Sequence, residues 1–253
     1  MKQIIRVSKI LGIILLLLML TGCAGTPQLT APGVTLTVGQ ANQPKDVNTG
    51  VQLLVLLTVL SLAPSIVIMA TAFTRIVIVL SLLRNAIGTP TVPPTQVLVG
   101  LALLLTFFVM APTYSKIDQT AIQPFLKGTI SQDTAITNGL APVRDFMFRQ
   151  TREKDLELFV SLNGQERPKT RDDISMVVLL PAFVISELRT AFTMGFVIFI
   201  PFLVMDMVIS SVLLSMGMMM LPPSLISLPF KLLLFIMVDG WYLVTQSLVT
   251  SFK

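Results

Sequence analysis

Residues 51–74 read VQLLVLLTVLSLAPSIVIMATAFT, without one charged side chain. A helix of about 20 apolar residues is long enough to cross the hydrocarbon core of a bilayer, which is about 30 Å thick. Beyond Arg75 the apolar pattern continues to Leu83, and a single helix from Val51 to Leu83 would be on the order of 50 Å long at about 1.5 Å per residue. A helix of that length must tilt, protrude or break, and we expect the break at Pro64.

Three further apolar segments follow, namely Thr95–Ser115, Met176–Leu214 and Leu225–Phe252. The 253 residues are 53% hydrophobic and 12% charged, whereas about a quarter of an ordinary soluble domain is charged. This composition excludes a soluble globular enzyme. We predict an all-α membrane protein with two pairs of hydrophobic helices, one within residues 51–115 and one within residues 175–253.

The chain has no histidine and a single cysteine, Cys23. Their scarcity excludes histidine general bases, Ser-His-Asp triads and histidine metal ligands, as well as an internal disulfide or a cysteine-based metal site. We therefore expect no enzyme activity, no catalytic residue, no metal and no cofactor.

The N-terminus has the order of a signal peptide, which we place at residues 1–22. Three basic residues among the first nine precede the apolar run Ile10–Leu20, as an n-region precedes an h-region. Their removal lowers the formal charge from +5 to +2, so nucleic acid is a poor candidate partner. Residues 23–50 are rich in Gly, Pro, Thr and Gln, which is typical of a flexible exported linker.

The end of this segment, Leu20-Thr21-Gly22-Cys23, resembles a lipobox, in which Cys23 is lipidated after cleavage. The alternative is ordinary cleavage after Ala24, with Gly22 and Ala24 as the small residues. Either reading exports the chain and places its mature N-terminus outside the cell membrane.

Residues 116–174 form a different kind of segment, in which basic and acidic side chains are equally numerous. We predict a helical extracytoplasmic domain here. The positive-inside rule supports this side, because Arg75 and Arg84 stand without acidic neighbours between the first two apolar segments. Pro142 is the expected start of a helix that carries Phe146.

A second helix of this domain is expected to carry Phe159 and to end at Asn163-Gly164. Thr170, followed by Asp173, is typical of the N-cap of the next helix.

Isolated charges in the last two apolar segments are candidate functional residues, because each costs a few kcal/mol at the centre of a membrane helix unless it is paired or hydrated. Glu187 and Arg189 are two residues apart and point to different faces of a helix, so they cannot pair with each other. Lys231 has the sign to match Glu187, and we predict a buried pair between them. A proton relay through Glu187 or Asp206 is an alternative, although no carboxylate cluster is present.

A methionine run, Met218, Met219 and Met220, lies between the last two apolar segments. Gly217 and Pro222-Pro223 disfavour a continuous helix, so we expect a loop. Non-helical backbone at membrane depth occurs only where protein buries it or where it lines a cavity. The three thioethers would then seal a pore and adapt to different shapes. The alternative is a simple turn whose methionines dip into lipid.

The longest recognisable motif runs from Pro181 to Phe196 and includes Pro181, Ala182, Phe183, Ser186, Glu187, Leu188, Gly195 and Phe196. It resembles the signature of the flagellar biosynthesis protein FliP family. Residues 69–89, with Phe73-Thr74-Arg75-Ile76 and Leu83-Arg84-Asn85-Ala86-Ile87-Gly88-Thr89, resemble that family's other diagnostic stretch. The similarity extends from about Val51 to the C-terminus.

The resemblance implies a core subunit of the flagellar type III protein export gate in the bacterial inner membrane, at the flagellar basal body. In that family several copies, a pentamer, assemble with FliQ-like and FliR-like subunits into a channel for unfolded export substrates. It also implies that Met218, Met219 and Met220 form the channel gate and that Glu187 and Lys231 bridge neighbouring subunits. Phe146 and Phe159 match aromatic residues of self-assembly.

Three alternatives stay open at this point. One is a subunit of a virulence-type secretion system, which belongs to the same class of export machinery. Another is an ion-coupled transporter that uses Glu187 and Asp206 as carriers, although no inverted repeat of the usual kind is visible. The last is a membrane-anchored receptor whose domain at residues 116–174 binds a ligand.

Overall fold

The computed structural model describes residues 29–31, 34–36, 44–164, 168, 170–218 and 221–252. The predicted signal peptide with Cys23 lies outside the described residues, and so do two of the three predicted gate methionines, Met219 and Met220.

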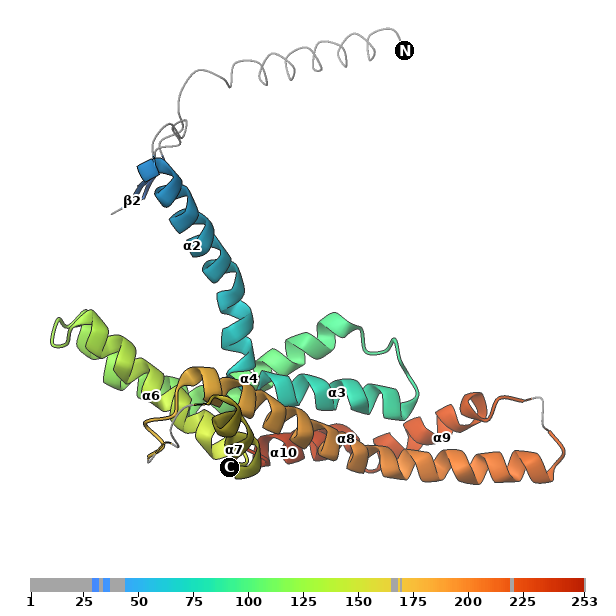
Figure 1. Cartoon of the computed structure of the whole chain (residues 1–253). Coiled ribbons are helices and arrows are strands. Elements are labelled where there is room, and N and C mark those ends of the chain that lie inside the picture. The colour runs from blue at the N-terminus through green and yellow to red at the C-terminus, as the bar shows by residue number, and fades with distance from the viewer. Residues whose placement is uncertain are drawn as a thin grey trace, which may run out of the picture. The chain divides into compact units, whose positions relative to one another are not determined.

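The chain is predominantly helical, which confirms the predicted fold class in its main feature (Figure 1). The helices in chain order are α2 (Pro44–Met69), α3 (Phe73–Ile87), α4 (Thr95–Ile117), the π-helix η1 (Asp118–Ile122), α5 (Gln123–Leu126), α6 (Gln132–Gln150), α7 (Glu153–Leu162), α8 (Met176–Ser215), α9 (Pro223–Met237) and α10 (Gly240–Thr250).

Residues 1–61 and 62–253 form two compact units. The first contains an antiparallel hairpin of β1 (Leu29–Ala31) and β2 (Val34–Leu36), in which Thr30 pairs with Thr35. It also contains the first part of α2, which begins at Pro44 and so inside the stretch predicted to be a linker.

Three helical stretches in the described part of the chain are long and apolar enough to cross a membrane: Val51–Met69, Thr95–Leu126 and Met176–Ser215. The helices α9 and α10 together make a fourth if they count as one span bent by 64°. These stretches match the four predicted apolar segments. The structure adds a break in the first and a bend in the last.

The break in the first apolar segment lies at residues 70–72, so the prediction of a break at Pro64 is wrong. A proline inside a helix removes one hydrogen bond, and α2 continues through that loss. At Thr71 the side chain competes directly with the helical ladder. Its hydroxyl donates to the Ile68 carbonyl at 2.7 Å and accepts from the Phe73 amide at 3.4 Å, so it serves the end of α2 and the start of α3.

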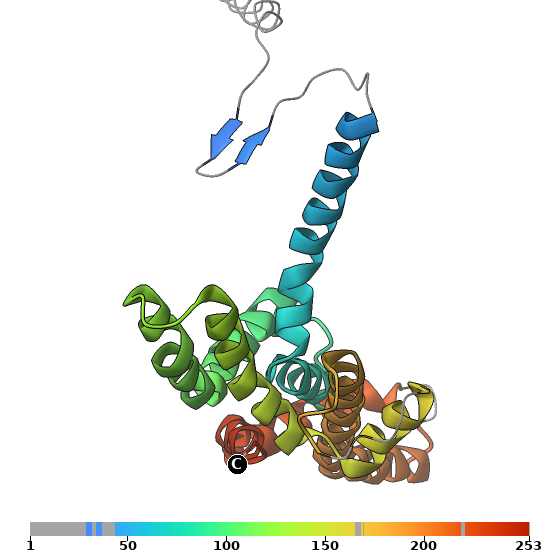
Figure 2. The same cartoon turned by 60° about the vertical axis from the view of Figure 1, so that its left-hand side comes forward.

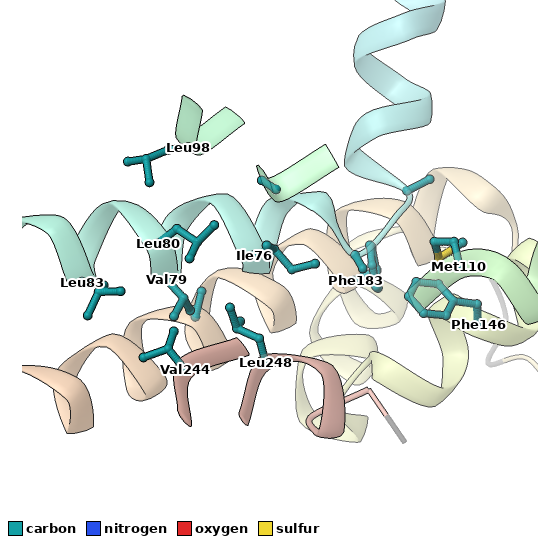
Figure 3. Packing of buried hydrophobic residues seen from close by; sticks show 14 of the residues in the cluster. Ile76, Val79, Leu80, Leu83, Leu98, Met110, Phe146, Phe183, Val244 and Leu248 are labelled. Atoms are coloured by element: carbon teal, nitrogen blue, oxygen red, sulfur yellow. The ribbon is translucent and has the colours of Figure 1, made fainter. Parts of the chain in front are cut away.

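Helix α3 lies at the centre of the second unit. Its side chains at Ile76, Val79, Leu80 and Leu83 are buried, as the helical spacing of an inward face requires. Side chains from α4, α6, α8 and α10 gather around this face (Figure 3). The core therefore joins both predicted helix pairs.

The polar domain predicted for residues 116–174 comprises η1, α5, α6 and α7, with α6 running back along η1 and the end of α4 (Figure 2). Helix α6 begins at Gln132, where Ser131 accepts a hydrogen bond from the Thr134 amide, so the predicted start at Pro142 is wrong. A proline is tolerated inside this helix.

The ends of the next two helices give one confirmed and one wrong prediction. Helix α7 ends at Leu162 with Asn163 as its C-cap, as predicted, and Gly164 follows with a φ of +65°. The N-cap of α8 is Ser175, five residues after the predicted Thr170. The Thr170 amide instead donates to the Asp173 carboxylate at 2.9 Å, which closes a separate turn before the helix.

Candidate functional site

Arg75 is the centre of a buried polar cluster that joins distant parts of the second unit. Its Nε donates to Glu187 Oε2 at 2.9 Å, and its Nη2 donates to Glu187 Oε1. The other donors reach Gln150 Oε1, the Ser251 carbonyl and Ser251 Oγ, each at 2.9 Å. A guanidinium has five N–H donors, and all five are used here.

The ring of Phe252 covers the same guanidinium, with its centroid 3.9 Å from Cζ. Gln150 also donates to the Phe252 carbonyl at 3.2 Å. A buried cation is tolerable only when it is paired and hydrogen-bonded, and this cluster meets both conditions. Arg75 thus ties α3 to α6, α8 and the segment after α10.

A second polar cluster joins α8 to α9. Asp206 accepts from Lys231 Nζ at 2.6 Å and from Ser227 Oγ at 2.6 Å, one bond to each carboxylate oxygen. Lys231 Nζ also lies 3.4 Å from the Ala86 carbonyl in the last turn of α3. The side chain of Lys231 is 8% exposed and that of Asp206 34% exposed, so the lysine depends more on the pair.

The buried pair predicted between Glu187 and Lys231 is not present within the chain. Glu187 and Lys231 each have a partner in their own chain, namely Arg75 and Asp206, and they do not pair with each other here. A pair between neighbouring copies remains a prediction, which a single chain does not test. Arg189 and Asp239, the other charges of these helices, are exposed.

The signature from Pro181 to Phe196 lies on α8 and is used largely inside the chain. Ala182 and Phe183 are buried in the core. Ser186 donates to Asp155 at 2.7 Å and accepts from the Arg152 amide at 3.1 Å, which fixes the start of α7 against α8. In contrast, Phe196 is exposed and Pro181 and Leu188 are partly exposed.

The packing around Gly195 explains why the signature has a small residue at this position. A Cβ at this position would overlap Leu82 of α3, lying 3.1 Å from its Cβ and closer still to its Cδ1. Ala191, one turn earlier, is buried as well. The small-xxx-small spacing of Ala191 and Gly195 therefore serves the close packing of α8 on α3 within one chain.

The two aromatic residues predicted for self-assembly differ in burial. Phe146 is 3% exposed and packs edge-on against Phe183, with 6.0 Å between ring centroids, and stacks on Phe252. Phe159 is partly buried against the same core. A role of Phe146 in assembly would therefore act through the fold of the polar domain rather than by direct contact.

The predicted interruption at the methionine run is confirmed in the residues described on either side of it. Helix α8 ends at Ser215, Gly217 has a φ of +75°, and α9 begins at Pro223. Met218 is 39% exposed. Helices α8 and α9 pack together as a helical hairpin (Figure 1).

Sequence reasoning missed the partners of Glu187. Arg75 was visible as a lone charge of the opposite sign, and that signal alone could have suggested the pair. Gln150 and Ser251 gave no such signal, because polar residues at helix ends are common. Within the described part of the chain, no three His, Cys, Asp or Glu side chains gather where they could hold a metal ion.

The family model of the FliP family matches residues 56–248 of the chain. The chain belongs to the FliP family. The flagellar biosynthetic protein FliP of Bacillus subtilis is 54% identical over 217 residues, which cover 86% of this chain and 98% of that protein. The FliP of Pectobacterium carotovorum is 57% identical, over 80% of this chain and 78% of its own length.

A more distant relative extends the match further along this chain. The FliP of Aquifex aeolicus is 47% identical over 224 residues, 88% of this chain and 92% of that protein. The region that the FliP family model matches includes Arg75, Glu187 and Gln150 of the first cluster and all of the second cluster, whereas Ser251 and Phe252 follow it. Membership of a flagellar family displaces the transporter and receptor alternatives, and the relatives named here are flagellar proteins rather than virulence proteins.

Proposed function

We propose that the chain is a channel-forming core subunit of the flagellar type III export gate, which passes unfolded flagellar proteins across the bacterial inner membrane. It acts without enzyme chemistry or a cofactor. Several copies, five by the family resemblance, assemble with FliQ-like and FliR-like subunits at the flagellar basal body. In this proposal residues 116–174 face the extracytoplasmic side.

Membership of the FliP family is the observation that carries this proposal. The exposed surface of the chain supports it. Large apolar side chains such as Phe192, Phe196, Leu203 and Met207 lie bare along α8. Apolar surface of this extent marks contact with lipid or with other subunits. A membrane assembly supplies both.

The gate of the proposed channel is Met218, Met219 and Met220. Thioether side chains are apolar and adaptable, so a ring of them contributed by several copies can close against water and yield to a passing chain. The position of the run in the sequence supports this role, because α8 ends before it at Ser215 and α9 begins after it at Pro223.

The pair between Glu187 of one copy and Lys231 of the next is part of the proposal for the assembled channel. Lysine has three N–H donors, and those of Lys231 directed at Asp206 and Ala86 leave a third. Glu187 is buried, so α8 would have to shift on assembly. A double-mutant cycle on oligomer dissociation, with Glu187→Gln and Lys231→Gln, tests the pair, and additive effects would overturn it.

Deletion of the gene tests the export function directly. Cells without the chain should retain their flagellar filament protein and release none into the medium, whereas a plasmid copy of the gene should restore release. The Asp145→Asn variant is a matched control, because Asp145 and Arg149 form an exposed pair away from the core. Normal release from the deleted strain would contradict the proposal.

The processing of the N-terminus is tested by metabolic labelling. If Cys23 is lipidated, the mature protein should incorporate labelled palmitate, and Cys23→Ser should abolish the label. An unlabelled wild-type protein that begins at Gly25 would establish ordinary cleavage instead.

A further inference from the structure

The end of the α8–α9 hairpin is held by very little hydrophobic packing. We use the name methionine hairpin for residues 207–226. Leu213 is the one described residue of this hairpin that is buried. Apolar residues on both arms, including Val212, Leu214 and Leu225, are more than half exposed. Packing within the chain normally fixes the position of a helix, so within one chain the contacts at the base of the arms carry more of this task.

Polar contacts stand at the base of the methionine hairpin. Asp206 is the residue before its first arm, and Ser227 is the residue after its second arm. The Ser227 hydroxyl donates to Asp206 Oδ1 at 2.6 Å, and Lys231, one turn further on, donates to Oδ2 at 2.6 Å. We call these three residues the Asp206 latch.

The bonds of the latch are of a strong kind. Hydrogen bonds to an ionised carboxylate are short and about twice as strong as neutral ones. Ser227 and Lys231 are both buried, so water does not compete for their donors as it does at the surface. Removing one partner would leave the lysine without its counter-charge in an apolar setting.

The latch also touches the end of α3. Lys231 Nζ lies 3.4 Å from the Ala86 carbonyl, at the C-terminal end of that helix, where the helix dipole favours a cation. Gly88 caps α3 in the left-handed conformation, and a Cβ there would lie 3.4 Å from Leu228 of α9. The base of the hairpin is therefore anchored to the central helix of the core.

We infer that the Asp206 latch is the positioning device of the gate: it fixes at their base the two arms between which the proposed gate lies in the sequence. The role of the latch in a gate rests on the proposed function. The contacts of the latch itself do not depend on that proposal. Asp206 is a positioning residue, which acts on Met218 through the arms of the hairpin. The described residues of the arms beyond this anchor are largely exposed, so the arms can shift without movement of the core.

Asp206→Asn is the sharpest change, because asparagine keeps the shape of the side chain. In either orientation its neutral amide removes the counter-charge of Lys231, and with its oxygen on Ser227 its NH2 group would face the ammonium, donor against donor. Ser227→Ala removes one bond and keeps the ion pair, so it should have a smaller effect. It serves as the second variant if Asp206→Asn does not accumulate. Asp145→Asn is the matched control for the loss of an acid.

The distance between the arms can be measured by spin labels at Val212 and Leu225, both exposed, in a Cys23→Ser chain within the complete export complex. We expect a narrow distance distribution in the parent and a severalfold broader one after Asp206→Asn. A second pair of labels, at exposed Leu158 and Val177 near the α7–α8 contact, reports on the core and should not change. The Asp145→Asn control should match the parent at both label pairs.

Conductance of the idle complex in a planar bilayer supplies the functional readout. Asp206→Asn should raise it severalfold, and Ser227→Ala should raise it less. Unchanged distances at Val212 and Leu225 would overturn the latch itself. Broadened distances with the conductance of the parent would overturn its role in the gate. Replacement of the methionines themselves tests the proposed channel separately, so failure of the latch and failure of the function remain distinguishable.

Discussion

Arg75 and Glu187 are charged residues within apolar sequence, and the structure buries both of them. Each would be costly alone, because a buried charge without a partner loses its hydration and gains nothing in return. Together with Gln150 and Ser251 they form one fully hydrogen-bonded cluster. The cluster makes the contact between α3 and α8 specific, since an apolar face alone would tolerate other registers.

The Glu187→Gln variant tests this cluster at the scale of one residue. Breaking a buried pair by removing one partner costs about 3–5 kcal/mol, because the other charge is left uncompensated. We expect a loss of that order in the stability of the purified chain in detergent, measured by thermal unfolding. Changing Arg75 and Glu187 together to leucine should cost less than Glu187→Gln alone.

The exposed pair of Asp145 and Arg149 is the control for Glu187→Gln. Both side chains are about half exposed, at 52% and 51%. An exposed pair of this kind contributes about 0–1 kcal/mol, so Asp145→Asn should leave the unfolding temperature nearly unchanged. Equal unfolding temperatures for the two variants would show that burial of Glu187 does not matter.

At the scale of helices, the contact between α3 and α8 depends on a missing side chain. Gly195→Ala would place a Cβ against Leu82, and both its Cβ and its Cγ lie too near for ordinary contact. Overpacking of this kind costs about 1–3 kcal/mol. We expect Gly195→Ala to lower the thermal stability of the chain. Leu82→Ala in the same chain should recover part of the loss, because it makes room for the new methyl group.

Gly100 in α4 offers the matched control for Gly195. Apart from its chain neighbours and the backbone of its own helix, nothing in the chain lies within 4 Å of the position its Cβ would take. Alanine has the higher helix propensity, by about 1 kcal/mol, so Gly100→Ala should be neutral or stabilising. A loss of stability as large as that of Gly195→Ala would mean that the lack of space beside Leu82 is not what makes Gly195→Ala costly.

The helices show which features a sequence can predict. Apolar stretches longer than a bilayer is thick predicted the membrane-capable helices, and Asn163-Gly164 predicted the end of α7, because both signals are local. The break at residues 70–72 was missed, because its signal is not local. The Thr71 hydroxyl can bond as it does only where the backbone turns, and that turn depends on the packing of α3 in the core. Proline misled twice, at Pro64 and Pro142, because long helices tolerate one lost bond.

The site shows the same division. The methionine run was predictable as a break in helix, because Gly217 and Pro222-Pro223 flank it in the sequence. The partners of Glu187 and Lys231 were not, because Arg75 lies 112 residues from Glu187 along the chain and only the tertiary fold brings them together. Opposite charge restricts which residues can pair. Because the apolar segments contain several isolated charges, more than one set of pairs is still possible.

At the scale of the molecule, the length of α8 limits how the chain can sit in a membrane. Its 40 residues extend about 60 Å at about 1.5 Å per residue, twice the roughly 30 Å of hydrocarbon in a bilayer. Either about half of this apolar helix therefore lies outside the lipid, or the whole helix is strongly tilted. Apolar surface outside lipid needs a protein partner, which agrees with an assembly of several subunits.

In the proposed assembly, Met218, Met219 and Met220 close the channel. A barrier to water and ions requires bulk and apolar surface, and it does not require any particular polar contact. Replacing Met218, Met219 and Met220 together by alanine removes most of that bulk while leaving both polar clusters intact. The assembled complex should form in normal amount but conduct ions when no substrate is passing.

Leucine at the same three positions separates bulk from flexibility. Its side chain is apolar and of similar volume, so the idle complex should stay closed. It is also branched and less adaptable than methionine, so export of flagellar proteins should slow. Conductance of the purified complex in a planar bilayer, with the parent, alanine and leucine forms side by side, decides the matter. Equally low conductance in the parent and the alanine form would place the barrier elsewhere along the channel.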